Sequence, residues 1–398
     1  MKGRACLNCL LTRVPVYHGD GGLYAYEIKY RRLEGSESSG SGGFFGVDLQ
    51  RVCGGAKALV ELSRDLIKNG VLAGFSADNV VAVISGRDIL SDRDAVEACR
   101  DLKRKGYSFA LDDFKRGRGF EEMLELCDIV MLDFVNPLTA QESAAYICGF
   151  TNKSILAKSI SSRGNFENAK RIGCSYVQGD FFLKPQRDLR NLQPLPISIA
   201  KAMKIMSKPE SDVDEITEVL SQDTAVCQKI LRLINSAYFG VTNKISSIGQ
   251  AIIVLGLDYL REWIYMLAIQ HISQNENSEL MRLALITAKF CRMLAGEIPG
   301  AKNDTEAFYL MGRMSVLVFS NDRLLTSALA ELPLTDEIKN GILRKSGLYG
   351  DVFGMAVDFC MGKWEHFSAL AAALGIDPLK AADMFVAAIE ESDRVDFG

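Results

Sequence analysis

Residues 80–113, VVAVISGRDILSDRDAVEACRDLKRKGYSFALDD, contain a complete strand–helix–strand unit. Val80–Ile84 and Ser108–Asp113 are short, mainly apolar runs with the length of buried strands. Between them, Asp94–Lys105 repeats apolar residues at helical spacing, and Gly106 follows as a natural stop. Two parallel neighbouring strands require a crossover of this kind, so the stretch predicts a parallel β/α fold.

The same alternation extends through the first half of the chain. Further candidate strands are Ile129–Phe134, Ser154–Ala157 and Tyr176–Phe182, and Tyr24–Arg31 is strand-like as well. Longer amphipathic segments separate most of them, as expected when helices connect parallel strands.

The pattern changes after Pro185. Residues 186–196 are polar and carry two prolines, and nothing strand-like follows them. From Pro196 onward the apolar residues recur at helical spacing, which predicts a helical bundle. We therefore expect two domains, a β/α domain over residues 1–190 and an all-helical domain over residues 191–398.

The composition fits two folded domains. The 398 residues are 48% hydrophobic and 24% charged, as in soluble globular proteins, whose domains average roughly 100–200 residues. The formal net charge of −4 gives no field that favours a polyanion, so we expect no nucleic-acid partner. We find neither a secretory signal nor an apolar stretch of about 18 residues, and we expect a cytoplasmic protein without a membrane segment. The ten cysteines lie mostly in apolar patterns, which is typical of small buried side chains and not of disulfides.

Charged and polar side chains stand on the predicted strands or directly follow them. In a (β/α)8 barrel, chemistry belongs at the carboxyl ends of the strands, because the loops that follow them build the active site. Glu27, Asp112 and Asp133 together have the oxygen ligands that suit a hard dication such as Mg²⁺ or Mn²⁺. The candidate positions are Glu27, Asp112, Asp113, Asp133, Lys158 and Gln178.

Three motifs at these positions resemble the EAL family, which hydrolyses cyclic dimeric GMP with two divalent metals. Residues 26–31 (YEIKYR) stand where the family has its Glu-Ala-Leu signature and a following Arg. Residues 110–114 (ALDDF) match its Asp-Asp-Phe-Gly strand, and residues 178–185 (QGDFFLKP) match its closing Gln-Gly-Tyr segment. The resemblance covers most of residues 10–186, agrees in order as well as in residue type, and implies an EAL-type TIM-like (β/α)8 barrel.

The departures from the family concern its active site. Two carboxylates of one family segment are replaced by Lys158 and Ser161, and Met131 stands in place of a family Lys. The metal-binding Asn and Glu of two earlier strands fall at residues 72–74 (LAG) and at about residues 85–86 (SG). A two-metal phosphodiesterase must hold its dications through several converging carboxylates, so these replacements are expected to abolish the metal site.

Lys158 supplies positive charge where the family has a carboxylate. It can replace one metal electrostatically and pair with Asp112 or Asp133, so we expect no enzymatic activity, no bound metal and no cofactor. One rival reading is a metal-independent sensor of cyclic di-GMP, because Arg31 and Gln178 correspond to nucleotide contacts of the family and an Arg can hold phosphate without a metal. A second rival is a residual phosphodiesterase that uses Mg²⁺ or Mn²⁺ on the three carboxylates named above.

Residues 231–250 (LRLINSAYFGVTNKISSIGQ) resemble the most recognisable stretch of HDOD domains. The resemblance spans roughly residues 194–390 and implies an all-helical HDOD bundle, a domain similar to HD phosphohydrolases that have lost their metal ligands. None of the three histidines, at 18, 271 and 366, is followed by Asp. We assign Asn235 to turn formation and Ser246-Ser247 to capping of the following helix.

Together the two resemblances identify an EAL–HDOD fusion. They imply a non-catalytic signal-transduction adaptor or regulator that acts by protein interaction. Its expected partners are other signalling proteins, with cyclic di-GMP as a candidate ligand and a homodimer suggested by analogy with EAL barrels.

Overall fold

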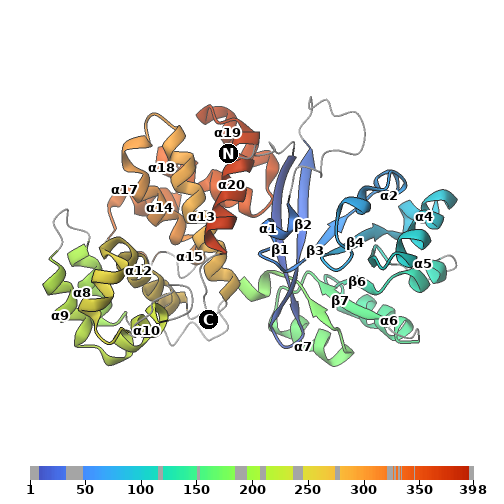
Figure 1. The fold of residues 1–398 in the computed structure, drawn as a ribbon, viewed down its shortest axis with the longest axis horizontal. Coiled ribbons are helices and arrows are strands. Elements are labelled where there is room, and N and C mark those ends of the chain that lie inside the picture. Colours follow the sequence, from blue (N-terminus) through green and yellow to red (C-terminus); the bar gives the residue numbers. More distant parts are fainter. Residues whose placement is uncertain are drawn as a thin grey trace. The chain divides into compact units, whose positions relative to one another are not determined.

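The computed structural model describes residues 9–32, 48–114, 120–149, 153–183, 195–206, 212–235, 245–273, 278–320, 326, 329, 332, 334–344 and 346–393 (Figure 1). The chain forms two compact units. The first consists of Met1–Phe181 with the short stretches Phe359–Trp364 and Asp377–Val386, and the second consists of the remainder. The expected boundary between residues 190 and 191 falls within residues 184–194, outside the described residues.

Eight strands close into a barrel in the first unit, in the order of the sequence. Strands β2 to β8 run parallel to one another, whereas β1 is antiparallel to both of its neighbours, β2 and β8. The predicted TIM-like (β/α)8 barrel is confirmed, with one strand reversed. The strands are β1 (Cys9–His18), β2 (Leu23–Arg32), β3 (Lys57–Glu61), β4 (Val80–Ser85), β5 (Ser108–Asp112), β6 (Ile129–Asp133), β7 (Ser154–Lys158) and β8 (Tyr176–Val177).

A tight turn explains the reversal of β1. His18 N–H donates to Gly22 O at 2.7 Å, and Gly21 N–H donates to His18 O at 2.9 Å. Gly21 has φ +101°, a conformation that is open to glycine at little cost. A connection this short can join only antiparallel strands, since a parallel pair needs a crossover.

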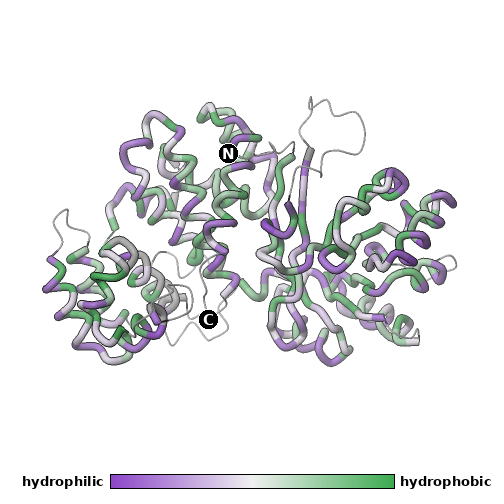
Figure 2. The backbone as a smooth tube through the Cα atoms, in the orientation of Figure 1, coloured by the Kyte–Doolittle hydropathy of each residue, from purple (hydrophilic) through white to green (hydrophobic). Residues whose placement is uncertain are grey.

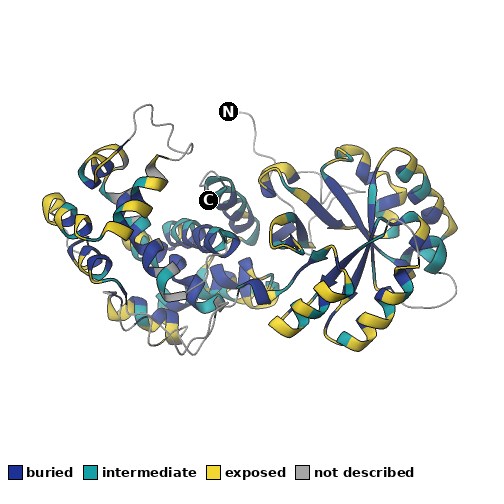
Figure 3. Cartoon of the chain, turned by 90° about the horizontal axis from the view of Figure 1, so that it is seen from below, coloured by how far each residue is buried: buried dark blue, intermediate teal, exposed yellow. Residues whose placement is uncertain are grey.

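Helices follow the remaining strands and cover the outside of the barrel (Figure 3). The predicted helix after β4 is confirmed as α4, Arg93–Arg104, which Asp92 caps by accepting from Asp94 N–H and Ala95 N–H. The others are α1 (Leu49–Val52), α2 (Arg64–Lys68), α3 (Gly86–Leu90), α5 (Phe120–Leu126), α6 (Pro137–Ile147) and α7 (Arg163–Ile172), with 3-10 turns η1 (Val71–Gly74) and η2 (Asp180–Leu183).

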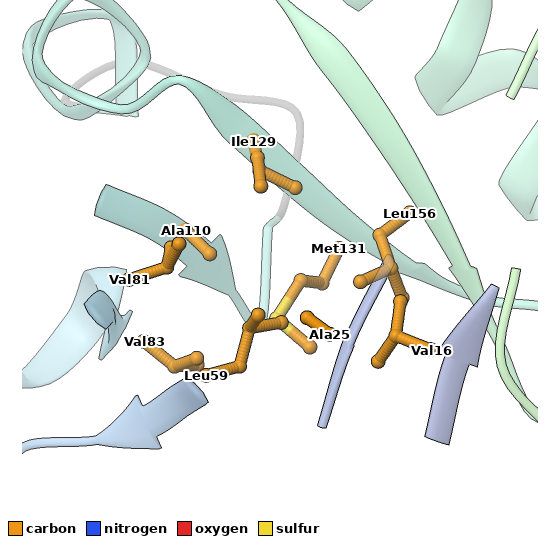
Figure 4. Close-up of a cluster of buried hydrophobic side chains, with 9 residues drawn as sticks. All are labelled: Val16, Ala25, Leu59, Val81, Val83, Ala110, Ile129, Met131 and Leu156. Atoms are coloured by element: carbon orange, nitrogen blue, oxygen red, sulfur yellow. The ribbon is translucent and has the colours of Figure 1, made fainter. Parts of the chain in front are cut away.

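The inside of the barrel is filled with apolar side chains. Figure 4 shows nine of them meeting from seven strands: Val16, Ala25, Leu59, Val81, Val83, Ala110, Ile129, Met131 and Leu156. Tyr24 and Tyr176 stack on each other at the amino-terminal end of this core, with ring centroids 3.9 Å apart. The barrel is therefore a packed core without a pore, and hydrophobic residues mark its strands while hydrophilic residues mark the outer helices (Figure 2).

Strand β1 also contacts a stretch from the far end of the chain, which belongs to the first unit. The Thr12 hydroxyl donates to Cys360 O at 2.8 Å, and this hydrogen bond is buried. Gly362 follows with φ +70°, and a Cβ there would stand 3.5 Å from Thr12 Cγ2. The first strand thus packs against residues that come near the end of the sequence.

The described residues of the second half form helices joined by turns, with no strand among them, as predicted (Figure 1). Its helices are α8 (Ile197–Met206), α9 (Val213–Ser221), α10 (Thr224–Ile234), α11 (Ile248–Leu255), α12 (Leu257–Ser273), α13 (Ser278–Glu297), α14 (Thr305–Arg313), α15 (Ser315–Ser320), α17 (Asp336–Arg344), α18 (Gly347–Cys360), α19 (Trp364–Leu374) and α20 (Pro378–Ser392), with the 3-10 turn η5 (Lys302–Asp304). No helix among the described residues combines the length and apolar character needed to cross a bilayer.

Close backbone packing and ion pairs organise the second unit. Helices α13 and α14 meet at Gly312, where a Cβ would lie 2.4 Å from the Ala288 Cα, so any larger residue would separate the helices. Arg282 forms an ion pair with Asp393 at 3.3 Å, and Lys289 Nζ donates to Glu391 O at 2.9 Å. These contacts attach α13 to the last helix of the chain.

Asn235 joins the end of α10 to Ile245, which lies three residues before α11. Its amide nitrogen donates to Ile245 O at 2.8 Å, and its amide oxygen accepts from Ile245 N–H at 2.8 Å. The same nitrogen donates to Leu231 O at 2.7 Å. The assignment of Asn235 to the fold is confirmed, and so is capping by Ser247, which accepts from Gln250 N–H at 3.2 Å.

We expect Asn235→Ala to lower the free energy of unfolding by about 2–3 kcal/mol, because it leaves the polar backbone groups of the buried Ile245 without these partners. Asn235→Asp keeps the acceptor and loses the donor, so the stability of this variant should lie between those of the native protein and of Asn235→Ala. Urea denaturation followed by circular dichroism measures this. The exposed Asn340 on α17 is the matched control, and Asn340→Ala should change stability by less than about 0.5 kcal/mol.

Candidate functional site

The predicted site residues lie at the carboxyl ends of β5, β6 and β7, on β2 and directly after β8. Asp112, Asp133 and Lys158 are the last residues of β5, β6 and β7, and Asp133 and Lys158 are register partners. Gln178 follows β8, and its side-chain nitrogen donates to Glu27 on β2 at 2.8 Å. The barrel therefore gathers five of the predicted side chains at one end.

The Lys158 ammonium is bound to Asp112, with Nζ 2.7 Å from Oδ2. Both side chains are largely shielded, at 20% and 31% exposed. Burial alone would lower the pKa of Lys158. The hydrogen bond to Asp112 and the charges of Asp112, Glu27 and Asp133 more than offset that effect, so the pKa is raised above its usual range. Lys158 is therefore a cation among carboxylates at neutral pH.

Glu27 is the most deeply buried acid of the site, with 3% of its side chain exposed. Besides Gln178, it binds Lys29, whose Nζ lies 2.5 Å from Oε1. Lys29 is two residues further along β2, on the same face of the strand, because side chains alternate between faces. The sequence-based prediction missed this partner, although the spacing from Glu27 was enough to find it.

The segment around Gln178 is fixed by backbone contacts. Gln178 N–H donates to Ala157 O at 2.8 Å, and Ile160 N–H donates to Gln178 O at 3.0 Å. A Cβ at Gly179 would lie 2.1 Å from Ile160 O, so only glycine fits there. This close approach holds the Gln178 side chain, 5% exposed, against Glu27.

The remaining predicted residues are exposed. Asp133 accepts from Val135 N–H at 2.9 Å, and Asp113 donates its N–H to Asp112 Oδ1 at 2.9 Å. Arg31 lies on β2, on the same face of the strand as Glu27, and its register partner is Leu10 of β1. These three side chains lie outside the shielded group formed by Glu27, Asp112, Lys158 and Gln178.

Two residues next to this group have left-handed backbones. Asp113 has φ +55° and Ser159 has φ +60°, and among the described residues no other non-glycine has positive φ. They directly follow Asp112 and Lys158, the two members of the ion pair. Strained backbone of this kind persists where the surrounding structure holds it, and here it turns the chain away at the strand ends.

The residues at this end of the barrel do not fit a divalent metal. Among the described residues, no group of three or more His, Cys, Asp or Glu side chains is placed to hold an ion. Met131 belongs to the barrel core, and Leu72 is 1% exposed. A Cβ at Gly86 would stand 2.5 Å from the Phe120 ring, so the aromatic ring takes the space of a side chain at that position.

The histidines have separate surroundings. His18 packs beside Tyr24 at the amino-terminal end of the barrel, with ring centroids 5.2 Å apart. His366 on α19 contacts Asp358 on α18 through Nδ1, and His271 is partly buried on α12. They lie on separate elements, and none falls within a metal-binding cluster of the described residues.

Comparison with known proteins gives matches to both halves of the chain. The HDOD domain family model matches residues 192–315. The uncharacterized protein YuxH of Bacillus subtilis is 24% identical over 96% of this chain and 98% of its own length. The cyclic di-GMP phosphodiesterase CdgJ of Vibrio cholerae is 28% identical over 71% of this chain, and the match spans 66% of that protein. Among solved structures, the FimX EAL domain of Pseudomonas aeruginosa bound to c-di-GMP aligns with a TM-score of 0.36 and 18% identity, over 44% of this chain and 89% of that one.

We expect Lys158→Gln to lower the free energy of unfolding by about 1–3 kcal/mol, between the values typical of exposed and buried ion pairs, because it leaves Asp112 without its cation. Adding Asp112→Asn should restore part of the loss. A double-mutant cycle by urea denaturation measures the coupling. If the loss in the double variant equals the sum of the losses in the two single variants, the coupling energy is zero and the ion pair does not stabilise the fold.

The pH dependence of that loss follows from the raised pKa of Lys158. A group with a raised folded-state pKa stabilises the fold fully below its unfolded pKa and loses this effect as the pH rises through the folded value. The stability difference between the native protein and Lys158→Gln should therefore be constant from about pH 7 to 9 and shrink above the lysine's ordinary value of 10.5. Chemical denaturation of both proteins across this range is the measurement.

Proposed function

We propose that this chain, an EAL-type barrel followed by an HDOD domain, is a signalling adaptor whose barrel acts by binding and not by turnover. The HDOD match and the CdgJ relative support this organisation, and together they link the chain to cyclic di-GMP signalling. Two parts of the proposal, that the protein is non-catalytic and that it is an adaptor, rest on residues of the two units.

One observation carries the non-catalytic reading: the Lys158 ammonium, 2.7 Å from Asp112, stands among the carboxylates that a metal-dependent phosphodiesterase would need. A dication at the same place would be repelled by the ammonium, and the raised pKa of Lys158 means that the repulsion persists at neutral pH. Glu27 is likewise already bound by Lys29 and Gln178. We therefore infer that this site does not hold the two metals that would activate a water molecule.

The adaptor role rests on the helical unit. Within the segment matched by the HDOD family, α11 carries two exposed apolar residues, Ile253 at 84% and Val254 at 52%. Exposed apolar side chains next to each other are typical of surfaces that bind other proteins. We infer that the partner is another signalling protein, and a second copy of the chain is the alternative partner.

Arg31 supports one alternative function, a metal-independent sensor of cyclic di-GMP. The guanidinium is exposed near the end of β2, where it can meet a phosphate bidentately. Gln178, the other family contact, is buried and bound to Glu27, so a nucleotide would have to displace it. The adaptor reading needs no such rearrangement, and we prefer it.

The test is isothermal titration of the full chain with cyclic di-GMP in EDTA and then in Mg²⁺ or Mn²⁺, followed by chromatography of the recovered nucleotide. We expect no heat of binding and intact nucleotide in each buffer. Binding that is independent of metal and disappears in Arg31→Ala would establish the sensor instead. Metal-dependent hydrolysis would overturn the non-catalytic reading.

A further inference from the structure

The hairpin of β1 and β2 continues beyond the rest of the barrel. Among the described residues, β2 pairs with β3 through Ala25–Ile28, and β1 pairs with β8 through Tyr17 and His18 alone. The first residues of β1 and the last residues of β2 therefore pair with each other and with no third strand of the described part. Because β1 is antiparallel to the other strands, its first residues lie at their carboxyl ends, where the candidate site is.

One face of this hairpin is continuous with the inside of the barrel. Val16 and Ala25 are register partners, and both belong to the barrel core. Side chains alternate along a strand, so every second pair lies on the same face. The next pairs on this face, toward the carboxyl end, are Val14 with Glu27, Thr12 with Lys29, and Leu10 with Arg31. The face that carries Glu27 thus extends to Thr12 and Leu10.

The two strands of this face differ in exposure. On β1, Leu10 is 0% exposed and Thr12 is 2% exposed. On β2, the Lys29 side chain is 42% exposed, and Arg31 is exposed as well. The β1 side of the face is therefore covered, whereas the β2 side is open to solvent.

Residues 359–364, which we call the strap, lie against Thr12. The Thr12 hydroxyl donates to Cys360 O at 2.8 Å, and a Cβ at Gly362 would stand 3.5 Å from Thr12 Cγ2. The strap belongs to the same unit as the barrel. Gly362 N–H donates to Phe359 O at 3.1 Å, which closes the strap into a tight turn. This turn needs φ +70° at Gly362, a conformation that costs glycine little.

Aromatic side chains hold the two ends of the strap, while its middle is accessible. Phe359 is fully buried, with its ring centroid 4.7 Å from that of Phe385 and 5.2 Å from that of Trp364. Between these ends, Met361 is 42% exposed. The middle of the strap can therefore lift away from Thr12 while the barrel core stays packed.

We propose that residues 359–364 are an autoinhibitory strap that closes the binding end of the barrel on its β1 side. In the closed state the strap occupies the face at Thr12, directly beside Lys29, and its release opens the approach to Glu27. This inference rests on the proposed function, because it takes the carboxyl end of the barrel as the binding end. It adds a regulated entrance that the far end of the sequence supplies.

The direct test is Gly362→Ala in the full chain, with chemical labelling read by mass spectrometry. Cys360 is 5% exposed, so iodoacetamide reaches its thiol mainly when the strap opens. A left-handed backbone is costly for alanine, and alkylation of Cys360 should become about 5–30-fold faster. Acetylation of Lys29 should rise by at least about twofold, because cross-strand partners lie side by side and Thr12 would be uncovered.

A second variant, Thr12→Val, loosens the strap without backbone strain. It removes the donor to Cys360 O and keeps the branched shape of the side chain. Loss of one hydrogen bond should accelerate alkylation of Cys360 by about 2–10-fold. This variant remains informative if Gly362→Ala fails to fold.

The controls match each substitution at a position outside the strap. Gly375→Ala introduces the same backbone strain, at φ +69°, in the second unit, where a Cβ would meet no neighbouring atom within 4 Å. Thr139→Val changes an exposed threonine on α6. Both should leave the labelling of Cys360 at the native rate. Cys99 on α4 is 0% exposed and reports general unfolding of the barrel, so its alkylation should stay at the native rate in every variant.

Four results would overturn the proposal. The first is alkylation of Cys360 in the native chain as fast as that of the exposed Cys148. The others are an unchanged Cys360 rate in both strap variants, an equal acceleration at Cys360 and Cys99, and faster alkylation of Cys360 with unchanged acetylation of Lys29. Hydrolysis of cyclic di-GMP by the native chain would refute the proposed function instead. The two failures are distinguishable because labelling is measured without nucleotide.

Discussion

Closure of the barrel by β1 is the constraint on which the rest of the first unit depends. Tyr17 and His18 pair with Val177 and Tyr176 on one side, while most of β1 pairs with β2 on the other. Without this strand, β2 and β8 would be open edges with unpaired backbone groups. Closure also brings Gln178 to Glu27 across 151 positions of sequence, and so it creates the contact on which the site is built.

Much of this fold could be predicted because the signals are local. The helix expected over residues 94–105 is found at Arg93–Arg104, and β4, β5, β6 and β7 lie close to their predicted runs. Strand β1 was missed because its partners come from a hairpin and from the far end of the barrel, so its short-range pattern differs from that of the β/α units. Strand β3 was missed as well, since its five residues follow a Gly-rich stretch and give a weak signal.

The candidate site, like the fold, could be predicted only in part. Strand ends could be located from the sequence, so the gathering of the acids and Lys158 at one end of the barrel could be expected. The choice between Asp112 and Asp133 as partner of Lys158 depends on stagger between strands and on side-chain reach, which no local pattern contains. The role of Lys29 was hidden for another reason, since the family motif directs attention to Glu27 and Arg31 on either side of it. Lys158 and Lys29 place positive charge beside Asp112 and Glu27, which offsets part of the repulsion among the acids at this end of the barrel.

The contact between Thr12 and Cys360 bears on the synthesis of the chain. These residues are 348 positions apart, so β1 is synthesised well before its partner. At the usual rate of about 5–20 residues per second, β1 is without this partner for roughly 20–70 s. Nascent chains of intermediate length should therefore expose part of β1, which makes chaperone demand and protease sensitivity of this protein depend on how quickly its last helices are translated.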